Sequence, residues 1–337
     1  MNPKYYKHKE GLILESGQLL HDLTIAYHTY GEFDPQKNNV VWVCHALTAN
    51  SDVFDWWSGL FGEDDYFNPK EHFIVCANIL GSCYGSTGPL SVYEKTGKPY
   101  YHEFPNLTVR DLVAAHEVLR LELGIERINT LIGSSLGGMQ ALEWAYNLNS
   151  NLDHLIFLAS NAWHSPWGIA FNESQRMAIA VDPTWKDSTD EAGLEGMKTA
   201  RSIALLSYRN YQTYQDTQSE TDPDKQDDFK ASSYQNYQGL KLANRFNAYS
   251  YWGLSKIMDG HNIGRGRISP EKALSQIQVK TLVIGVESDL LFPVAEQKFI
   301  AQNMPRAQYA EIGSLYGHDG FLLEQKQLTR VIQSFYK

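Results

Sequence analysis

The chain has 337 residues, of which 43% are hydrophobic and 20% charged, so it holds enough apolar material for one large core or two modest ones. A formal net charge of −10 argues against a nucleic acid or an anionic membrane as partner. The three cysteines, Cys44, Cys76 and Cys83, have no metal-type spacing, and the sequence shows neither a signal-peptide core nor a run of 18 apolar residues. We therefore expect a cytoplasmic protein with reduced thiols and no metal.

Short apolar runs alternate with amphipathic ones along much of the chain. The runs that predict strands are 40–45, 72–80, 128–133, 154–160, 279–286 and 307–313. Several are apolar throughout, as in a parallel sheet covered on both faces. Helical patterns cover 108–124, 136–148, 292–304 and 321–336. The first of these opens with Thr108 and Asp111 in capping-box spacing and ends at Gly124. This alternation predicts a doubly wound, mostly parallel α/β sheet.

The middle of the chain differs from both ends. Between about residues 165 and 267 we find no convincing strand, and helical pieces flank a polar tract at 211–238. The composition of that tract favours a flexible loop over a solvated helix surface. We therefore predict a core formed by residues 1–164 and 268–337, with residues 165–267 inserted as a helical lid.

The segment LIGSSLGGMQALEW, residues 131–144, joins a strand to a helix through two adjacent serines. A strained turn that exposes a nucleophile needs small residues two positions before and two after it. Centred on Ser135, both positions are glycine; centred on Ser134, they are Ile132 and Leu136, which are too large. Ser135 is therefore the candidate nucleophile, and the plain alternative is a glycine-softened turn with an incidental serine.

A serine nucleophile needs a base, and the base needs an acid to orient it. On this type of fold the acid and then the histidine follow the serine along the chain. His318, in the glycine-flanked loop YGHDGF, is the one histidine beyond the strand at 279–286. Glu287 and Asp289 directly follow that strand, and their spacing does not choose between them. The plain alternative is that Ser288 or Asp289 is the N-cap of the helix that follows.

Two backbone N–H groups would complete an oxyanion hole. One is that of Leu136, directly after the nucleophile, and the other comes from the loop after the strand at 40–45, with Leu47 as the expected donor. The glycine-rich loop at 80–89 lacks the G-K-[ST] of a phosphate loop and a following helix. We interpret that loop as structural or pocket-lining.

Further segments spread over nearly the whole predicted core carry a family pattern. They are CHALT (44–48), ANILGSCYGSTGP (77–89), FPNLTVRDLV (104–113), IGSSLGGMQALEWA (132–145), AFNESQRMAI (170–179), GVESDLLFP (285–293) and YGHDGFLLE (316–324). With these the chain resembles the homoserine O-acetyltransferases of the α/β-hydrolase superfamily. The resemblance implies the α/β-hydrolase fold with a lid, and its S-D-x-L-F-P run selects Asp289 as the acid.

The resemblance also implies an activity. Such an acyltransferase moves an acetyl group from acetyl-CoA to the hydroxyl of L-homoserine, a step of methionine biosynthesis. It works by a ping-pong route through an acyl-enzyme on Ser135, with His318 as proton shuttle and Asp289 as its orienter. Acetyl-CoA is then a co-substrate, no cofactor is bound permanently, and a homodimer forms through the lid helices.

A pocket for the amino acid is implied as well. The matching residues are Thr48, Arg201, Tyr208 and Asp319. Arg201 would bind the carboxylate of the acceptor, and Asp319 its ammonium group. Without the resemblance, Arg201 would be interpreted as a solvated helix arginine and Asp319 as a helix N-cap.

The chain departs from the usual family pattern close to the acyl pocket. Ser134 and Leu136 stand where the family usually has Gly and Met, and Ala49 where it often has Gly. These changes leave open succinyl-CoA as donor and serine as acceptor.

A serine esterase of the same fold is the first rival, but an esterase for apolar esters has no use for a charged pair such as Arg201 and Asp319. A catalytically inactive binding protein is the second rival, and such proteins typically lose a triad member.

Overall fold

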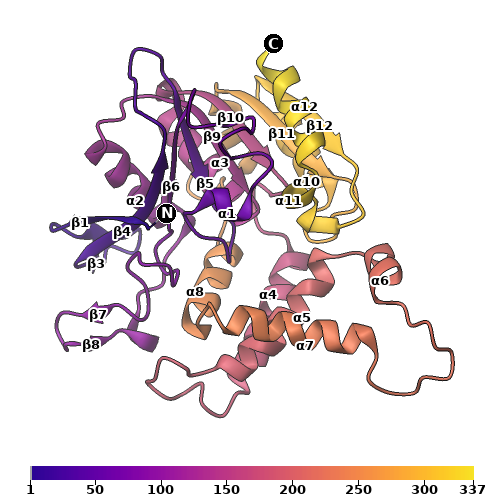
Figure 1. Cartoon of the computed structure of the whole chain (residues 1–337). Coiled ribbons are helices and arrows are strands. Elements are labelled where there is room, and N and C mark those ends of the chain that lie inside the picture. Colours follow the sequence, from indigo (N-terminus) through magenta and orange to yellow (C-terminus); the bar gives the residue numbers. More distant parts are fainter. Residues whose placement is uncertain (1) are drawn as a thin grey trace.

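The computed structural model describes residues 2–337, and an eight-stranded sheet forms its centre (Figure 1). The strand order is β1-β4-β6-β5-β9-β10-β11-β12. The strands are β1 (Lys4–His8), β4 (Leu23–Tyr30), β5 (Val40–Cys44), β6 (Phe73–Ala77), β9 (Ile128–Ser134), β10 (Leu152–Leu158), β11 (Lys280–Val286) and β12 (Ala307–Ile312). β4 pairs antiparallel with β1 and β6, and all other neighbours are parallel. The prediction of a mostly parallel, doubly wound sheet is confirmed.

Every strand expected from the sequence is present, but the antiparallel edge was not predicted. β1 and β4 belong to that edge, and two small hairpins lie outside the main sheet, β2 (Leu12–Ile13) with β3 (Leu19–Leu20) and β7 (Val92–Tyr93) with β8 (Lys98–Pro99). β4 buries the polar residues His28 and Thr29 among its apolar ones. Because polar side chains interrupt the run, a search for continuous apolar segments passes over it.

Helices cover both faces of the sheet. One hydrophobic cluster includes side chains of α2 (Val109–Glu122), α3 (Leu136–Leu148), α9 (Pro270–Gln276) and α10 (Val294–Asn303). The other includes side chains of α1 (Val53–Trp56) and α12 (Gln325–Tyr336). Successive residues of β5 alternate between the two clusters, with Trp42 in the first and Val41 and Val43 in the second. The central strands are thus buried on both sides, which explains their continuous apolar sequences.

One predicted helix has the expected ends, whereas another is divided into two helices. Thr108 caps α2 in a capping box with Asp111, and Gly124, at φ 67°, follows its end, as expected. The last predicted helix is instead two helices, α11 (Gly320–Leu323) and α12, because Glu324 leaves the helical conformation at φ −96° and ψ 43°.

Five helices and no strand occupy residues 166–259, and Figure 1 shows them gathered below the sheet. They are α4 (Pro166–Ala180), α5 (Leu194–Tyr208), α6 (Tyr211–Gln218), α7 (Lys230–Ala243) and α8 (Ala248–Asp259). The expectation of a flexible loop at 211–238 is wrong over most of its length, since α6 and α7 take up both ends. Asn210 caps α6 through the N–H of Thr213, and Tyr214 donates a hydrogen bond to Gln235 of α7. These contacts satisfy polar side chains whose composition alone suggested disorder.

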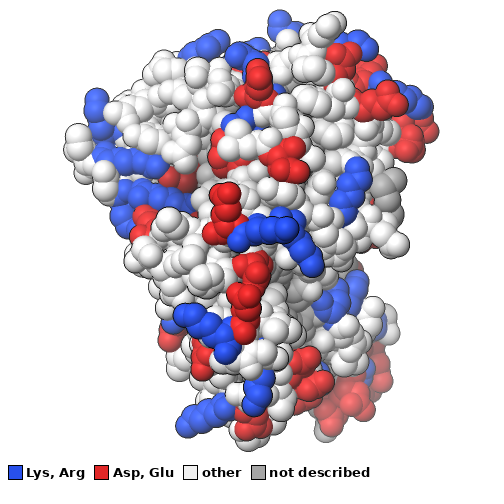
Figure 2. Space-filling view, turned by 90° about the vertical axis from the view of Figure 1, so that its left-hand side faces the viewer, with Lys and Arg blue, Asp and Glu red and all other residues white. Residues whose placement is uncertain are grey.

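Charged side chains of both signs are interspersed on the face shown in Figure 2. Within residues 2–337, no helix is both long and apolar enough to span a membrane. The same part of the chain contains no group of three or more His, Cys, Asp or Glu residues able to hold a metal ion. Cys44, Cys76 and Cys83 are all free thiols.

Candidate active site

The turn between β9 and α3 places Ser135 in a backbone conformation that non-glycine residues rarely adopt. Its φ is 54° and its ψ −126°. A Cβ added to Gly133 would lie 2.1 Å from the carbonyl oxygen of Gly137, and a Cβ on Gly137 would lie 2.0 Å from that of Cys44. The glycine spacing is therefore a steric requirement of this turn. Ser134 is completely buried and its Oγ has no hydrogen-bond partner, so it does not reach the cavity described below.

Asp289 and His318 form a buried pair beside this turn. The imidazole Nδ1 of His318 lies 2.6 Å from Oδ2 of the Asp289 carboxylate. His318 is 3% exposed and Asp289 4%. The other carboxylate oxygen accepts the backbone N–H groups of Leu291 and Phe292, at 2.8 and 2.9 Å. Asp289 is therefore fixed by the loop on one oxygen and holds the imidazole with the other.

This geometry distinguishes the two acids that the spacing left open. Glu287 is exposed, and its backbone N–H bonds to the carbonyl of Ile312 at the edge of the sheet. The capping alternative for Asp289 does not apply, because Pro293 is the N-cap of α10. Only Asp289 of the two candidates contacts His318.

The surroundings of His318 affect its pKa in opposing ways. Burial alone would lower the pKa, but the charge and hydrogen bond of Asp289, with a smaller contribution from Asp319, raise the pKa above its ordinary value of 6.5. The paired carboxylate therefore stabilises the protonated form of the ring. The bond at Nδ1 directs the other ring nitrogen, Nε2, away from Asp289.

A cavity of about 470 Å³ brings the serine and the histidine together with residues from distant parts of the chain. The predicted site residues that line it are Leu47, Thr48, Ser135, Arg201, Tyr208, His318 and Asp319. Asp289 lies behind His318, out of the cavity. Leu136 is fully buried and begins α3 directly after Ser135, so its backbone N–H is one of the donors left free at a helix N-terminus.

Arg201 reaches the cavity from α5 with its charge unpaired. Its guanidinium carbon lies 5.2 Å from the ring centroid of Tyr208, and it takes part in no ion pair within residues 2–337. The ring of Tyr208 lies in turn 5.7 Å from that of His318. A cation held over an aromatic ring, without a carboxylate, leaves its planar donors available to an anionic ligand next to the triad.

Asp319 has a partner that the sequence did not reveal. Nη2 of Arg209 lies 3.1 Å from its Oδ2, and the guanidinium carbon of Arg209 lies 5.6 Å from the ring centroid of Tyr316. Asp319 stands at the N-cap position of α11, as its alternative role as a helix cap expects, but its side chain makes no capping hydrogen bond. Arg209 directly follows Tyr208 at the end of α5, and that adjacency was the one signal in the sequence that could have identified it.

Further lining residues were also missed. Arg245 donates through Nη1 to the backbone oxygen of Thr48 at 2.6 Å and to the hydroxyl of Tyr84. Lys241 lines the same cavity. Tyr84 belongs to the glycine-rich loop at 80–89, which agrees with the pocket-lining interpretation of that loop.

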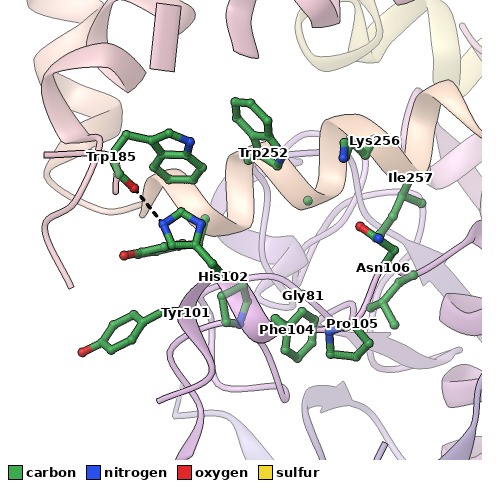
Figure 3. Close-up of a pocket in the computed structure, with 14 residues that line it drawn as sticks. Gly81, Tyr101, His102, Phe104, Pro105, Asn106, Trp185, Trp252, Lys256 and Ile257 are labelled. Carbon is green, nitrogen blue, oxygen red and sulfur yellow. Dashed lines mark hydrogen bonds between the residues drawn. The ribbon is translucent and has the colours of Figure 1, made fainter. Parts of the chain in front are cut away.

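A second cavity, of about 270 Å³, shares no lining residue with the first. In Figure 3, Trp252 and Lys256 of α8 lie on one side of it and Phe104 and Pro105 on the other. Its lining contains no serine, cysteine or carboxylate. The cavity that holds Ser135 and His318 is therefore the candidate active site.

The sheet order, the strained serine and the Asp–His pair define the class of protein as an α/β hydrolase. Residues 39–325 match the family model described as alpha/beta hydrolase fold. The homoserine O-acetyltransferase of Cyclobacterium marinum is 53% identical over 336 residues, covering 100% of this chain and 95% of its own. The chain belongs to the homoserine O-acetyltransferase family.

Solved structures agree on the fold. A homoserine O-acetyltransferase from Bacillus anthracis superposes with a TM-score of 0.91 at 24% identity, covering 99% of this chain and 96% of its own. An esterase named E22 reaches the same TM-score at 20% identity, with 99% of each chain covered. Since both likenesses are below 25% identity, they establish the shared fold and do not separate transferase from esterase.

Proposed function

We propose that this enzyme transfers an acetyl group from acetyl-CoA to the hydroxyl of L-homoserine through an acyl-enzyme on Ser135. The observation that carries the proposal is the unpaired guanidinium of Arg201 in the cavity of Ser135 and His318. An esterase for neutral esters gains nothing from such a charge, whereas an amino-acid acceptor brings a carboxylate to it. The membership of the chain in the homoserine O-acetyltransferase family supports the same substrate.

The first half-reaction acylates the serine. Nε2 of His318 accepts the proton of the Ser135 hydroxyl as its oxygen attacks the thioester carbonyl. The tetrahedral oxyanion is stabilised by the backbone N–H groups that we assign to Leu47 and Leu136. The intermediate collapses with cleavage of the C–S bond, and the imidazolium returns the proton to the departing thiolate of CoA. Asp289 holds the imidazole and balances its charge throughout.

The second half-reaction runs the same steps with an alcohol. The homoserine hydroxyl gives its proton to His318 and attacks the acyl carbon, and the Ser135 oxygen leaves and regains the proton. Arg201, with its guanidinium over the ring of Tyr208, binds the carboxylate of the acceptor in a bidentate contact. Asp319 accepts a hydrogen bond from the ammonium group of the acceptor. Burial raises the pKa of Tyr208, so its hydroxyl stays protonated beside these charges. Thr48 lines the same cavity.

The helices of residues 166–259 serve in this proposal as the lid, because α5 supplies Arg201 and Tyr208 to a nucleophile on the sheet.

We further propose a homodimer through this lid. Exposed apolar side chains on α5, α6 and α7 support it: Leu206, Tyr211, Tyr237 and Leu240. Light scattering on the purified protein measures the dimer directly. The free thiols fit the reducing environment of the cytoplasm.

The proposal is tested by giving the enzyme homoserine together with acetyl-CoA or succinyl-CoA and weighing the amino-acid product. Formation of O-acetylhomoserine at the higher rate supports it. Serine in place of homoserine tests the acceptor in the same assay. Release of free acetate with unmodified homoserine would identify an esterase instead.

A further inference from the structure

A buried serine outside the triad, Ser160, contacts the nucleophile turn from behind. It lies two residues after the end of β10, is completely buried, and donates its hydroxyl hydrogen to the backbone carbonyl of Ser135 at 2.7 Å. The same carbonyl accepts the N–H groups of Gly138 and Met139, at 2.9 and 3.2 Å. The two helical N–H groups are ordinary for the first turn of a helix, whereas the hydroxyl is an additional donor.

The carbonyl of Ser135 and the N–H of Leu136 belong to one peptide unit. Since that unit is planar, a donor that fixes the direction of the oxygen also fixes the direction of the N–H on its opposite side. The N–H of Leu136 is the donor that we assign to the oxyanion hole. A hydrogen bond to the carbonyl also polarises the peptide and makes its N–H a stronger donor.

Ser160 is itself held in place by other buried groups. The amide of Gln297, in α10, donates to the backbone carbonyl of Ser160 at 2.6 Å, and Gln297 is completely buried. The next residue along, Asn161, donates to Glu296 of the same helix at 3.0 Å. Two neighbouring pairs therefore attach the end of β10 to α10.

The first turn of α3 is shaped to receive this serine. A Cβ on Gly138 would lie 2.5 Å from Cβ of Ser160 and 2.9 Å from its Oγ. Any larger residue at 138 would force the two segments apart and break the hydroxyl contact. This close approach gives a reason for the second glycine of the sequence S-L-G-G-M.

We propose that Ser160 is a positioning residue, which orients the Ser135–Leu136 peptide so that the N–H of Leu136 is directed at the oxyanion. This inference rests on the proposed serine acyl transfer and assigns a task to a residue outside the cavity. Loss of an oxyanion donor costs about 10²–10³-fold in rate. Loss of the group that orients the donor should cost less, about tenfold or somewhat more.

The test compares Ser160→Ala with Ser134→Ala, a matched control that removes a neighbouring buried hydroxyl with no hydrogen-bond partner. Rapid mixing with acetyl-CoA measures acylation, and a trifluoromethyl ketone, which forms a tetrahedral adduct on serine, measures binding of the oxyanion. We expect Ser160→Ala to lose about tenfold in both acylation rate and ketone affinity, with an unchanged KM for acetyl-CoA. The acidic limb of its pH profile should not move, because the Asp289–His318 pair is intact.

Ser160→Cys keeps a side chain of similar size but offers only a weak donor, and it should fall between the wild type and Ser160→Ala. It also serves if the alanine variant does not fold. Wild-type acylation by Ser160→Ala, or slower acylation with unchanged ketone affinity, would overturn the inference. Those outcomes leave the proposed function intact, whereas normal acylation by Ser135→Ala would remove the proposed function itself.

Discussion

Arg209 and Asp319 form an ion pair at the wall of the catalytic cavity, with Nη2 and Oδ2 3.1 Å apart. The contact occupies one oxygen of the carboxylate, and in the proposed function the other oxygen binds the ammonium group of the acceptor. Arg209 itself is absent from the lining of the cavity, so we expect it to affect the acceptor through Asp319.

A double-mutant cycle tests this relationship. We expect Asp319→Asn to raise the KM for homoserine about tenfold and Arg209→Gln to raise it about three- to tenfold, with normal acylation by acetyl-CoA in both. The double variant should be no worse than Asp319→Asn alone, because the contribution of Arg209 passes through the carboxylate. Additive effects on acceptor KM would show that Arg209 acts independently.

Arg201 should affect only the second half-reaction. Arg201→Ala is expected to form acyl-enzyme nearly normally and to transfer it poorly, since a charge-assisted bidentate contact is worth on the order of 2–5 kcal/mol, or about 30-fold to several thousand-fold in acceptor kinetics. Lysine at this position should restore only part of the rate, because a point charge does not reproduce the planar fork. Rapid-mixing measurement of CoA release, followed by an acceptor chase, separates the two halves. Unchanged homoserine transfer by Arg201→Ala would place the amino-acid pocket elsewhere.

The pH profile should report the Asp289–His318 pair. His318 acts as a base only when neutral, and its pKa is raised, so wild-type activity should fall as the pH drops through a midpoint above about 6.5. In Asp289→Asn the main effect that raises the pKa of His318 is lost, and burial lowers this pKa, so the acidic limb should move to lower pH. The maximal rate should fall about 10³–10⁴-fold. Glu287→Gln is the control, because that carboxylate is exposed and away from the imidazole. An inactive Glu287→Gln with an active Asp289→Asn would reverse the assignment.

Glu296 should make the stability of the protein depend on pH. Burial raises the pKa of its carboxyl to about 7, an effect that hydrogen bonds from Asn161 and Ser165 only partly offset. Between pH 4.5 and 7 the folded protein therefore holds a proton that the unfolded chain has released, and stability declines as the pH rises through that range. Glu296→Gln removes this titration. The amide of the new glutamine can donate a hydrogen bond to Oδ1 of Asn161, which is buried and has no partner.

The expected result for Glu296→Gln is a melting temperature close to wild type at pH 5 and higher by about 1–4 °C at pH 8. Thermal unfolding at both pH values, with Glu287→Gln as an exposed control, provides the measurement. A difference from wild type that is the same at both pH values would show that Glu296 does not titrate in this range.

The sequence was most informative where local chemistry determines the structure. Close backbone contacts in the turn around Ser135 leave no room for a side chain at positions 133 and 137, so two glycines at fixed distances selected the candidate nucleophile from the sequence. The apolar runs located the parallel strands for a similar reason, because burial on both faces leaves no room for polar residues.

What the sequence could not supply depends on contacts between distant segments. Ser160 and Gln297 are ordinary polar residues until the sheet and α10 bring them together behind Ser135. The polar tract at 211–238 was misinterpreted because its helices are stabilised by tertiary contacts, such as the bond between Tyr214 and Gln235, and not by an apolar stripe. Arg201 and Asp319 were assigned only through the family resemblance, since neither residue type at its position indicates a buried pocket.

Mass spectrometry of the intact protein and of its fragmented peptides measures directly whether Ser135 carries an acyl group that passes to an amino acid. The enzyme is mixed with acetyl-CoA alone, sampled, and then chased with either homoserine or buffer. We expect one acetyl group on the peptide that contains Ser135, absent from Ser135→Ala, present in Ser134→Ala, and removed far faster by homoserine than by water. An acetyl group on Ser134, or loss of the acetyl group at the same rate with and without homoserine, would contradict it.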